Sequence, residues 1–219
     1  NALNEAIPDS DRDNEASPVM LIARSFDVNR PGSPWKEIKG GVIGGSLIQG
    51  QFQEGDEIEI RPGRQYISEN KAKWEPIVTK ITSMNKASHK VAVATPGGLS
   101  AIGTKLDPAI TKSDTLVGQV AGTIGSLPPV WDKLKFEVRL MDRVVGSASE
   151  QQIDPLRIKE PLMLSVGTAV TVGVVMTSKK NVVEVILKRP VCAEVGSRIA
   201  ISRQVGGRWR LIGMGILAE

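Results

Sequence analysis

Short apolar segments alternate with turn residues along most of this chain, and this pattern restricts its fold more than any other feature. The segments are rich in Val, Ile and Thr, and the first five span residues 19–26, 42–52, 57–61, 77–84 and 91–95. Turn signals separate them, at 29–32, 54–56, 61–63 and 96–98. Short strands with turns at this spacing are typical of β-sandwiches and β-barrels. The 22 Gly and 13 Pro leave little room for long helices.

A second block of such segments follows the adjacent residues Pro128 and Pro129, which interrupt strand pairing and indicate a domain boundary. Strands are predicted at 134–141, 161–165, 169–177, 182–187, 199–204 and 208–217, with a turn or loop at 150–158. Each block has the length and strand number of a small closed barrel. We therefore predict an all-β chain: a lead or linker at 1–17, then two tandem six- to seven-stranded β-barrels at 18–127 and 128–219.

The scarcity of cysteine and histidine excludes several classes of function. Cys192 and His89 are the only residues of their types, so they provide no internal disulfide, no zinc finger and no Ser-His-Asp or Cys-His pair. We expect Cys192 to be a small buried hydrophobic residue and His89 to lie on the surface. No apolar run reaches the ~18 residues that span a membrane, and the acidic start is unlike a signal peptide. The prediction is a cytoplasmic protein with no catalytic residue, no metal site and no membrane contact.

The segment KGGVIGGSLIQG at 39–50 is the densest local signal in the sequence. Its glycines suit a strand with bulges at a barrel corner. They also suit a surface where the backbone approaches a ligand closely. The residues alone favour the corner. A phosphate loop is disfavoured because the chain has no GxxxxGK[ST] pattern and no helix pattern follows the cluster.

Two further groups of polar residues have a structural interpretation. The segment TKSD at 111–114 is similar to the guanine-specificity motif of GTPases. Without a phosphate loop, we interpret it as a polar turn before a strand at Leu116. Asp56, Glu57 and Glu59 are interpreted as the rim and the solvent-facing side of a strand, because polar and apolar residues alternate there.

Charge is distributed unevenly along the chain. Residues 1–17 contain one basic and five acidic side chains, 18–127 contain 13 and 10, and 128–219 contain 14 and 9. The basic residues of the last block either protect strand edges from aggregation or form an electrostatic footprint for nucleic acid, and the sequence leaves both open. Aromatic residues are only 4% of the chain, which argues against a platform that stacks single-stranded bases.

Several blocks together resemble one family, the gamma subunit of archaeal and eukaryotic translation initiation factor 2. The blocks are RSFDVNRPG at 24–32, KGGVIGGSLIQG at 39–50, GDEIEIRPG at 55–63, PGGL at 96–99, IGTKLDP at 102–108, RVVG at 143–146, RPV at 189–191, ISR at 201–203 and RWRLIG at 208–213. The resemblance runs from about Pro18 to Ala218, and the first block, together with the next two, is the most specific part of it.

The resemblance implies a fold and a division of labour. The family's subunit has an N-terminal GTPase domain followed by two β-barrels of the kind found as domains 2 and 3 of elongation factor Tu. This sequence resembles the two barrels only, as domain II at 18–127 and domain III at 128–219. The GTP, the Mg and the GTPase activity would therefore belong to a domain outside this chain, which is expected to hold no cofactor and not to be an enzyme.

Partners follow from the same resemblance. The intact GTP-bound factor would deliver methionylated initiator tRNA to the small ribosomal subunit, and the alpha subunit would dock on domain II. The beta subunit is not expected, since it docks mainly on the GTPase domain. The terminal adenosine would lie near the glycine cluster and the 102–106 strand, where glycines admit the ribose and ester and cations reach phosphates. The tRNA-binding residues implied are Arg24, Lys39, Gly40, Gly41, Gly44, Gly45 and Lys105.

One alternative stays open. The chain would then be the barrel portion of another translational GTPase, such as the selenocysteine-specific elongation factor or a release-factor partner. The long blocks at 24–32 and 208–213 favour the initiation factor.

Overall fold

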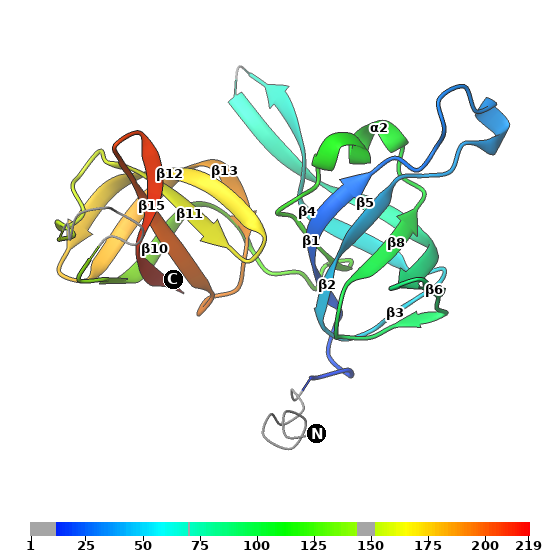
Figure 1. Cartoon of the computed structure of the whole chain (residues 1–219), viewed down its shortest axis with the longest axis horizontal. Coiled ribbons are helices and arrows are strands. Elements are labelled where there is room, and N and C mark those ends of the chain that lie inside the picture. The colour runs from blue at the N-terminus through cyan, green and yellow to red at the C-terminus, as the bar shows by residue number, and fades with distance from the viewer. Residues whose placement is uncertain (1–11, 70, 144–151) are drawn as a thin grey trace.

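The computed structural model describes residues 12–69, 71–143 and 152–219. It contains two closed six-stranded β-barrels (Figure 1), which confirms the predicted all-β fold. Strands of the first barrel lie between Val19 and Thr123, and those of the second between Val130 and Ala218. The domain limits at 18–127 and 128–219 remain our proposal.

The first barrel has the strand order β4-β9-β1-β2-β8-β5 and closes through pairing of β4 with β5. Strand β6 extends this sheet beside β5, and β3 pairs with β7. The strands are β1 (Val19–Phe26), β2 (Val42–Gln49), β3 (Phe52–Gln53), β4 (Glu57–Ser68), β5 (Lys71–Lys86), β6 (His89–Lys90), β7 (Val93–Ala94), β8 (Ser100–Thr104) and β9 (Val120–Thr123). Three single turns of helix complete it: η1 (Trp35–Glu37), α2 (Pro108–Thr111) and η2 (Lys112–Asp114).

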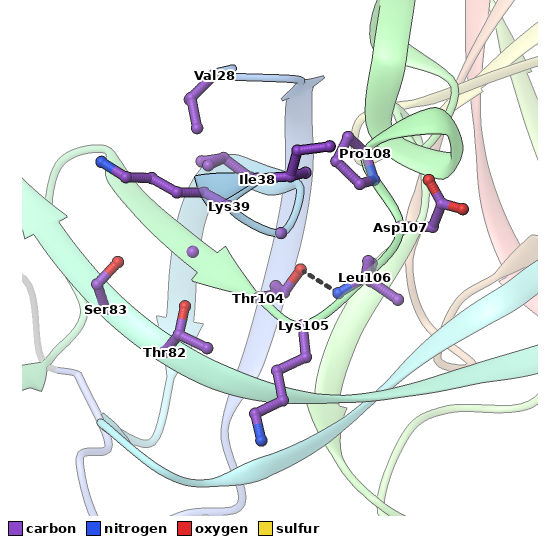
Figure 2. A pocket seen from close by; sticks show the side chains of 13 residues that line it. Val28, Ile38, Lys39, Thr82, Ser83, Thr104, Lys105, Leu106, Asp107 and Pro108 are labelled. Atoms are coloured by element: carbon purple, nitrogen blue, oxygen red, sulfur yellow. Dashed lines mark hydrogen bonds between the residues drawn. The ribbon is translucent and has the colours of Figure 1, made fainter. Parts of the chain in front are cut away.

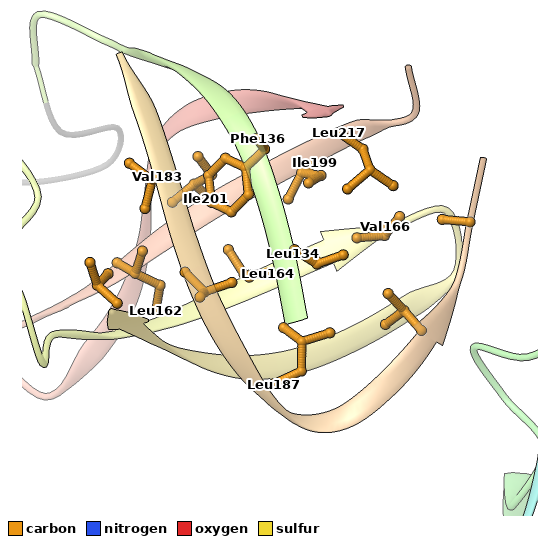
Figure 3. Close-up of a cluster of buried hydrophobic side chains, with 14 of the residues drawn as sticks. Leu134, Phe136, Leu162, Leu164, Val166, Val183, Leu187, Ile199, Ile201 and Leu217 are labelled. Carbon is orange, nitrogen blue, oxygen red and sulfur yellow. The ribbon is translucent and has the colours of Figure 1, made fainter. Parts of the chain in front are cut away.

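The second barrel has the strand order β10-β13-β12-β11-β14-β15. Its strands are β10 (Val130–Leu140), β11 (Pro161–Val166), β12 (Ala169–Lys179), β13 (Val182–Cys192), β14 (Arg198–Val205) and β15 (Arg208–Ala218). Alternate residues of each strand point inward, as the two-residue period of a β-strand requires. Figure 3 shows the resulting core, in which Leu134 and Phe136 of β10 meet Leu162 and Leu164 of β11.

Strands β4 and β5 continue past the wall of the first barrel as a two-stranded arm, visible in Figure 1 as the projecting cyan strands. Residues 64–68 pair with 71–75, while pairing of β4 with β9 ends at Arg61 and pairing of β5 with β8 begins at Ile81. The arm is therefore held by a single ladder, and Tyr66 and Ile67 are 40% and 79% exposed.

The prediction of a turn at 61–63 was wrong, because β4 runs through these residues with an irregularity between Ile60 and Arg64. The buried side chain of Gln119 accepts a hydrogen bond from Gly63 N (2.8 Å) and donates one to Gly63 O (3.0 Å). Because a residue 56 positions away satisfies this backbone, the chain continues as a bulged strand.

The placement of Glu59 on a solvent-facing side was also wrong, since this residue is only 5% exposed. Its carboxylate forms an ion pair with Arg61 (3.0 Å) and accepts a hydrogen bond from Gly125 N (3.0 Å). Gly125 lies in the connection between the barrels. The outer side of β4 is therefore covered by a segment that strand alternation does not reveal.

Smaller differences concern segment ends. The segment at 42–52 is two strands, because the chain turns at Gly50 between β2 and β3. Only Val93–Ala94 is extended within 91–95, and the strand expected at Leu116 begins at Val120. Residues 1–11 of the expected lead, 144–146 of the RVVG block and 150–151 of the expected loop lie outside the described residues.

A small apolar cluster joins the barrels. Val19 and Val120 of the first barrel pack with Leu127 of the connection and Cys192 of the second barrel. Gly118 approaches the second barrel so closely that a Cβ there would lie 2.8 Å from Ala169 Cα. Cys192 is 6% exposed, which confirms the expected buried residue, and its thiol donates to Pro128 O (3.3 Å).

Burial raises the pKa of the Cys192 thiol from 9.0 to about 12. The thiol therefore stays protonated when the folded protein is mildly alkaline, and we expect slow reaction with a thiol-specific reagent until urea unfolds the chain. Because the folded pKa is raised, the stability linked to this group is retained below pH 9.0 and lost as pH rises toward about 12. Equal labelling rates in buffer and in urea would contradict this assignment.

Candidate functional site

The glycine cluster begins at the entrance to β2 and is joined there to the end of β8. Gly41 N donates to Leu106 O (2.9 Å), and Thr104 N donates to Gly41 O (3.0 Å). The hydroxyl of Thr104, a residue only 1% exposed, donates to the same Gly41 oxygen at 2.7 Å. These bonds fix the start of the cluster against residues 104–106.

Three of the four glycines predicted to bind tRNA are required by close packing within the chain. A Cβ at Gly40 would overlap the carbonyl oxygen of Thr104, and one at Gly41 would overlap the Thr111 side chain. A Cβ at Gly45 would overlap the carbonyl oxygen of Leu21 on β1. Packing within the chain is therefore enough to explain a glycine at these three positions.

Gly44 differs from the other three. A Cβ there would find its nearest atoms at 3.7 Å (Arg24 Cβ) and 3.9 Å (Ser100 O), which is ordinary van der Waals contact. Packing does not require a glycine at this position. Gly44 thus leaves open space on the outer side of β2, as the ligand-surface interpretation expects.

A hollow of about 770 Å³, here the Lys39 pocket, lies on the outer side of the first barrel (Figure 2). Val28, Ile38, Val42 and Pro108 give it apolar walls, and Thr82, Ser83, Thr104 and Asp107 add polar groups. Lys39 and Lys105 extend from different sides of it, as Figure 2 shows. Both lysines are exposed, and neither has an ion-pair partner in the described part of the chain. The pocket therefore offers free positive charge beside an apolar wall.

A smaller hollow of about 230 Å³, here the Leu99 pocket, lies further along the same strands. Gly44, Gly45 and Ala101 form its floor, and its walls are Ala23, Arg24, Phe26, Asn85, Ala87, Leu99 and Ser100. Phe26 and Leu99 are 37% and 68% exposed, so both apolar side chains are open to a ligand. Arg24 is the one cation at its edge.

Strand register places the two pockets next to each other. Val42 pairs with Gly103 and Gly44 with Ala101 across β2 and β8. Gly103 pairs with Ser83 and Ala101 with Asn85 across β8 and β5. The first row lines the Lys39 pocket and the second row lines the Leu99 pocket, so they are two residues, or about 7 Å, apart on one face.

The predicted residues therefore divide between the two pockets. Lys39, Gly40 and Lys105 line the Lys39 pocket, while Arg24, Gly44 and Gly45 line the Leu99 pocket. Gly41 is buried behind them and lines neither. The sequence analysis missed Phe26, Val28, Ser83 and Leu99 as individual residues. Phe26 and Ser83 lie on β1 and β5, while Val28 and Leu99 lie just beyond the ends of β1 and β8. Alternation of outward-facing residues along these segments is the signal that would have found them.

Arg24 is not a free cation. Its Nε donates to Asp114 Oδ1 at 3.0 Å, and the same oxygen accepts a hydrogen bond from Ser25 N at 2.9 Å. The pKa of Asp114 is lowered by the bond from Ser25 N–H and by Arg24. The carboxylate is thus engaged by the protein's own β1, so segment 111–114 does not fit a guanine base.

The remaining candidates from the sequence are His89 and any group of metal-ligating side chains. His89 is exposed on β6, as expected of a surface residue. Within residues 12–69, 71–143 and 152–219, no three His, Cys, Asp or Glu side chains are grouped as a metal site would need. None of the helices in these ranges is long and apolar enough to cross a membrane.

Comparisons with known proteins agree with this architecture. Residues 132–217 match the family model described as "Initiation factor eIF2 gamma, C terminal". The translation initiation factor 2 subunit gamma of Methanococcus vannielii is 55% identical over 216 residues, which is 99% of this chain and 53% of the relative. That of Thermococcus kodakarensis is 54% identical over 218 residues, again 53% of the relative. The chain thus spans about half the length of these curated relatives.

A solved structure provides a fold comparison. The crystal structure of a bacterial selenocysteine-specific elongation factor superposes with a TM-score of 0.68 over 99% of this chain and 30% of the other. Sequence identity is 18%, so this likeness shows the translation-factor fold alone. The stronger finding is that relatives more than 50% identical in sequence match nearly all of this chain. The chain therefore belongs to the family of translation initiation factor 2 gamma subunits and corresponds to the C-terminal part of those subunits.

Proposed function

We propose that this chain binds the aminoacylated acceptor end of initiator tRNA, as part of a factor that delivers methionylated initiator tRNA to the small ribosomal subunit. The observation that carries the proposal is the single face on which the Lys39 and Leu99 pockets adjoin. Six of the seven residues named from the family resemblance line that face. The GTPase step and its GTP and Mg are assigned to the part of the relatives that this chain does not cover.

The two pockets differ in the groups they suit. The Lys39 pocket is large enough for a nucleoside, and its two unpaired lysines suit the phosphates on the 5′ side of a terminal adenosine. The Leu99 pocket is small and mostly apolar, and its open floor at Gly44 suits an unbranched side chain such as that of methionine. We therefore place the terminal adenosine in the Lys39 pocket and the methionyl side chain in the Leu99 pocket.

Binding of a methionylated acceptor-stem RNA tests this assignment. Lys39→Ala and Lys105→Ala are each expected to weaken binding several-fold and to make the slope of log affinity against log salt shallower by about 0.7–0.9, the share of one neutralised phosphate. Gly44→Val fills the Leu99 pocket, so it is expected to reduce the preference for methionylated RNA over the same RNA without methionine. Lys188→Ala removes an exposed cation of the second barrel and is the control. Unchanged binding in all three site variants would rule out this face.

We further propose that the alpha subunit docks on the first barrel, and that the beta subunit requires the remainder of the relatives' length. The family membership supports the first point, and this chain matches the C-terminal part alone. Purified alpha subunit is expected to co-purify with this chain, and purified beta subunit is not. The reverse result would overturn both assignments.

A further inference from the structure

The short helix η2 has an unusual backbone for residues with side chains. Ser113 and Asp114, at its end, have φ angles of 58° and 60°, in the left-handed region that residues with a side chain adopt rarely, although Asp tolerates it better than Ser does. Such residues persist only where surrounding interactions hold them, and they gather at functional sites. Asp114 is held by hydrogen bonds from β1.

Those interactions lead directly to the Leu99 pocket. Asp114 Oδ1 accepts from Ser25 N and from Arg24 Nε, two consecutive residues of β1. Arg24 pairs with Gly44 across β1 and β2 and stands at the edge of the pocket. The left-handed turn thus brings the carboxylate of Asp114 to Arg24. Arg24 is the cation that lines the Leu99 pocket, and Asp114 itself does not line it.

The ion pair leaves most of the guanidinium available. Asp114 engages Nε, while the two terminal amino groups of Arg24 have no hydrogen-bond partner among the described residues. The Arg24 side chain is 69% exposed. A planar guanidinium held at one N–H presents its remaining donors as a fixed fork, which matches phosphate geometry.

We propose that Asp114 is a positioning residue for RNA binding, whose carboxylate orients Arg24 so that its terminal amino groups meet a phosphate of the acceptor strand beside the Leu99 pocket. This inference rests on the proposed function. Asp114 itself touches no RNA. It acts by restricting an exposed, flexible side chain to one direction before the ligand arrives, which lowers the entropic cost of binding.

A double-mutant cycle on this chain, with methionylated acceptor-stem RNA, tests the inference. Arg24→Ala is expected to weaken binding about tenfold, and Asp114→Asn about fivefold. Asn tolerates the left-handed backbone and its amide oxygen still accepts from Ser25 N, so the fold is preserved. What the variant removes is the negative charge, which weakens the hold on the Arg24 guanidinium because a neutral acceptor binds a cation less strongly than a carboxylate does. In the Arg24→Ala background, Asp114→Asn is expected to change binding less than about twofold, because its effect passes through Arg24.

Two controls separate positioning from a general structural role. Ser113→Gly relieves the backbone without touching the ion pair and is expected to leave the RNA affinity unchanged. In the Lys39→Ala background, Asp114→Asn is expected to keep its full effect, since Lys39 lies in the other pocket. An equal loss of affinity in the presence and absence of Arg24 would overturn the inference, as would no loss at all.

The same measurements distinguish failure of the inference from failure of the proposed function. If Lys39→Ala and Lys105→Ala weaken binding while Arg24→Ala and Asp114→Asn do not, only the role of Asp114 and Arg24 is wrong. If none of the four variants weakens binding, the acceptor end does not lie on this face, and both proposals fail.

Discussion

Replacing Gly45 by alanine is expected to destabilise the first barrel by more than about 3 kcal/mol. The new Cβ would overlap the carbonyl oxygen of Leu21, and neither group is the movable end of a flexible side chain. Relief requires β1 and β2 to separate where Gly45 pairs with Ile22, which would break the barrel ladder. Thermal unfolding followed by circular dichroism is expected to show a midpoint lower by roughly 6–12 °C.

Gly44→Ala is the matched control, because it makes the same chemical change one residue away. Its Cβ would have no neighbour nearer than 3.7 Å, so packing is not disturbed. Alanine also restricts the unfolded chain more than glycine does, and the expected stability is equal or slightly higher. Equal destabilisation at both positions would show that glycine is needed in β2 for a reason other than the approach of Leu21.

Replacing Phe136 by alanine is expected to cost about 3–5 kcal/mol of stability. Phe136 is fully buried, and its ring lies among the inward side chains of the second barrel shown in Figure 3. Gly215 on β15 lies directly against the ring, so the barrel is shaped around this side chain. Truncation leaves a cavity that the closed ladder cannot collapse to fill, and scanning calorimetry measures the destabilisation.

Trp35→Ala is the control for that variant, because it deletes a larger aromatic side chain that is 78% exposed. The Nζ of Lys36 lies 5.4 Å from the centroid of the Trp35 ring, which is an exposed cation–π contact. The expected change in stability is within about 0.5 kcal/mol. A loss of stability below about 1 kcal/mol for Phe136→Ala would show that the second barrel can collapse around the cavity, which contradicts this prediction.

Alternation and turn residues predicted the barrels well where the information is local. The segment at 19–26 coincides with β1, and Phe136 and its neighbours alternate inward as the period of two requires. The failures at 61–63 and at Glu59 have a common cause. Gln119 and Gly125 lie some 60 residues further along the chain and form hydrogen bonds with Gly63 and Glu59. From the local sequence alone, Gly63 looks like a turn residue and Glu59 like a surface residue.

The site was predictable in part. Family resemblance, rather than composition, selected the seven residues. Arg24 and Gly44 lie side by side only because β1 pairs with β2, which the local sequence does not reveal. The register of β2, β8 and β5 divides the site into two pockets, and register is set by the whole barrel. The same applies to Asp114, whose carboxylate bonds to a residue 90 positions away.

The projecting β4–β5 arm makes this chain easy to engineer. Residues 64–68 and 71–75 pair with each other and with no other strand in the described part of the chain, so an inserted peptide or a fluorescent label after Ser68 is expected to leave both barrels intact. Gln65 and Trp74 of the arm line a hollow shared with Thr168 and Val170 of the second barrel. A dye attached at Ile67, 79% exposed on the same arm, would therefore report on the spacing of the two barrels while partners bind elsewhere.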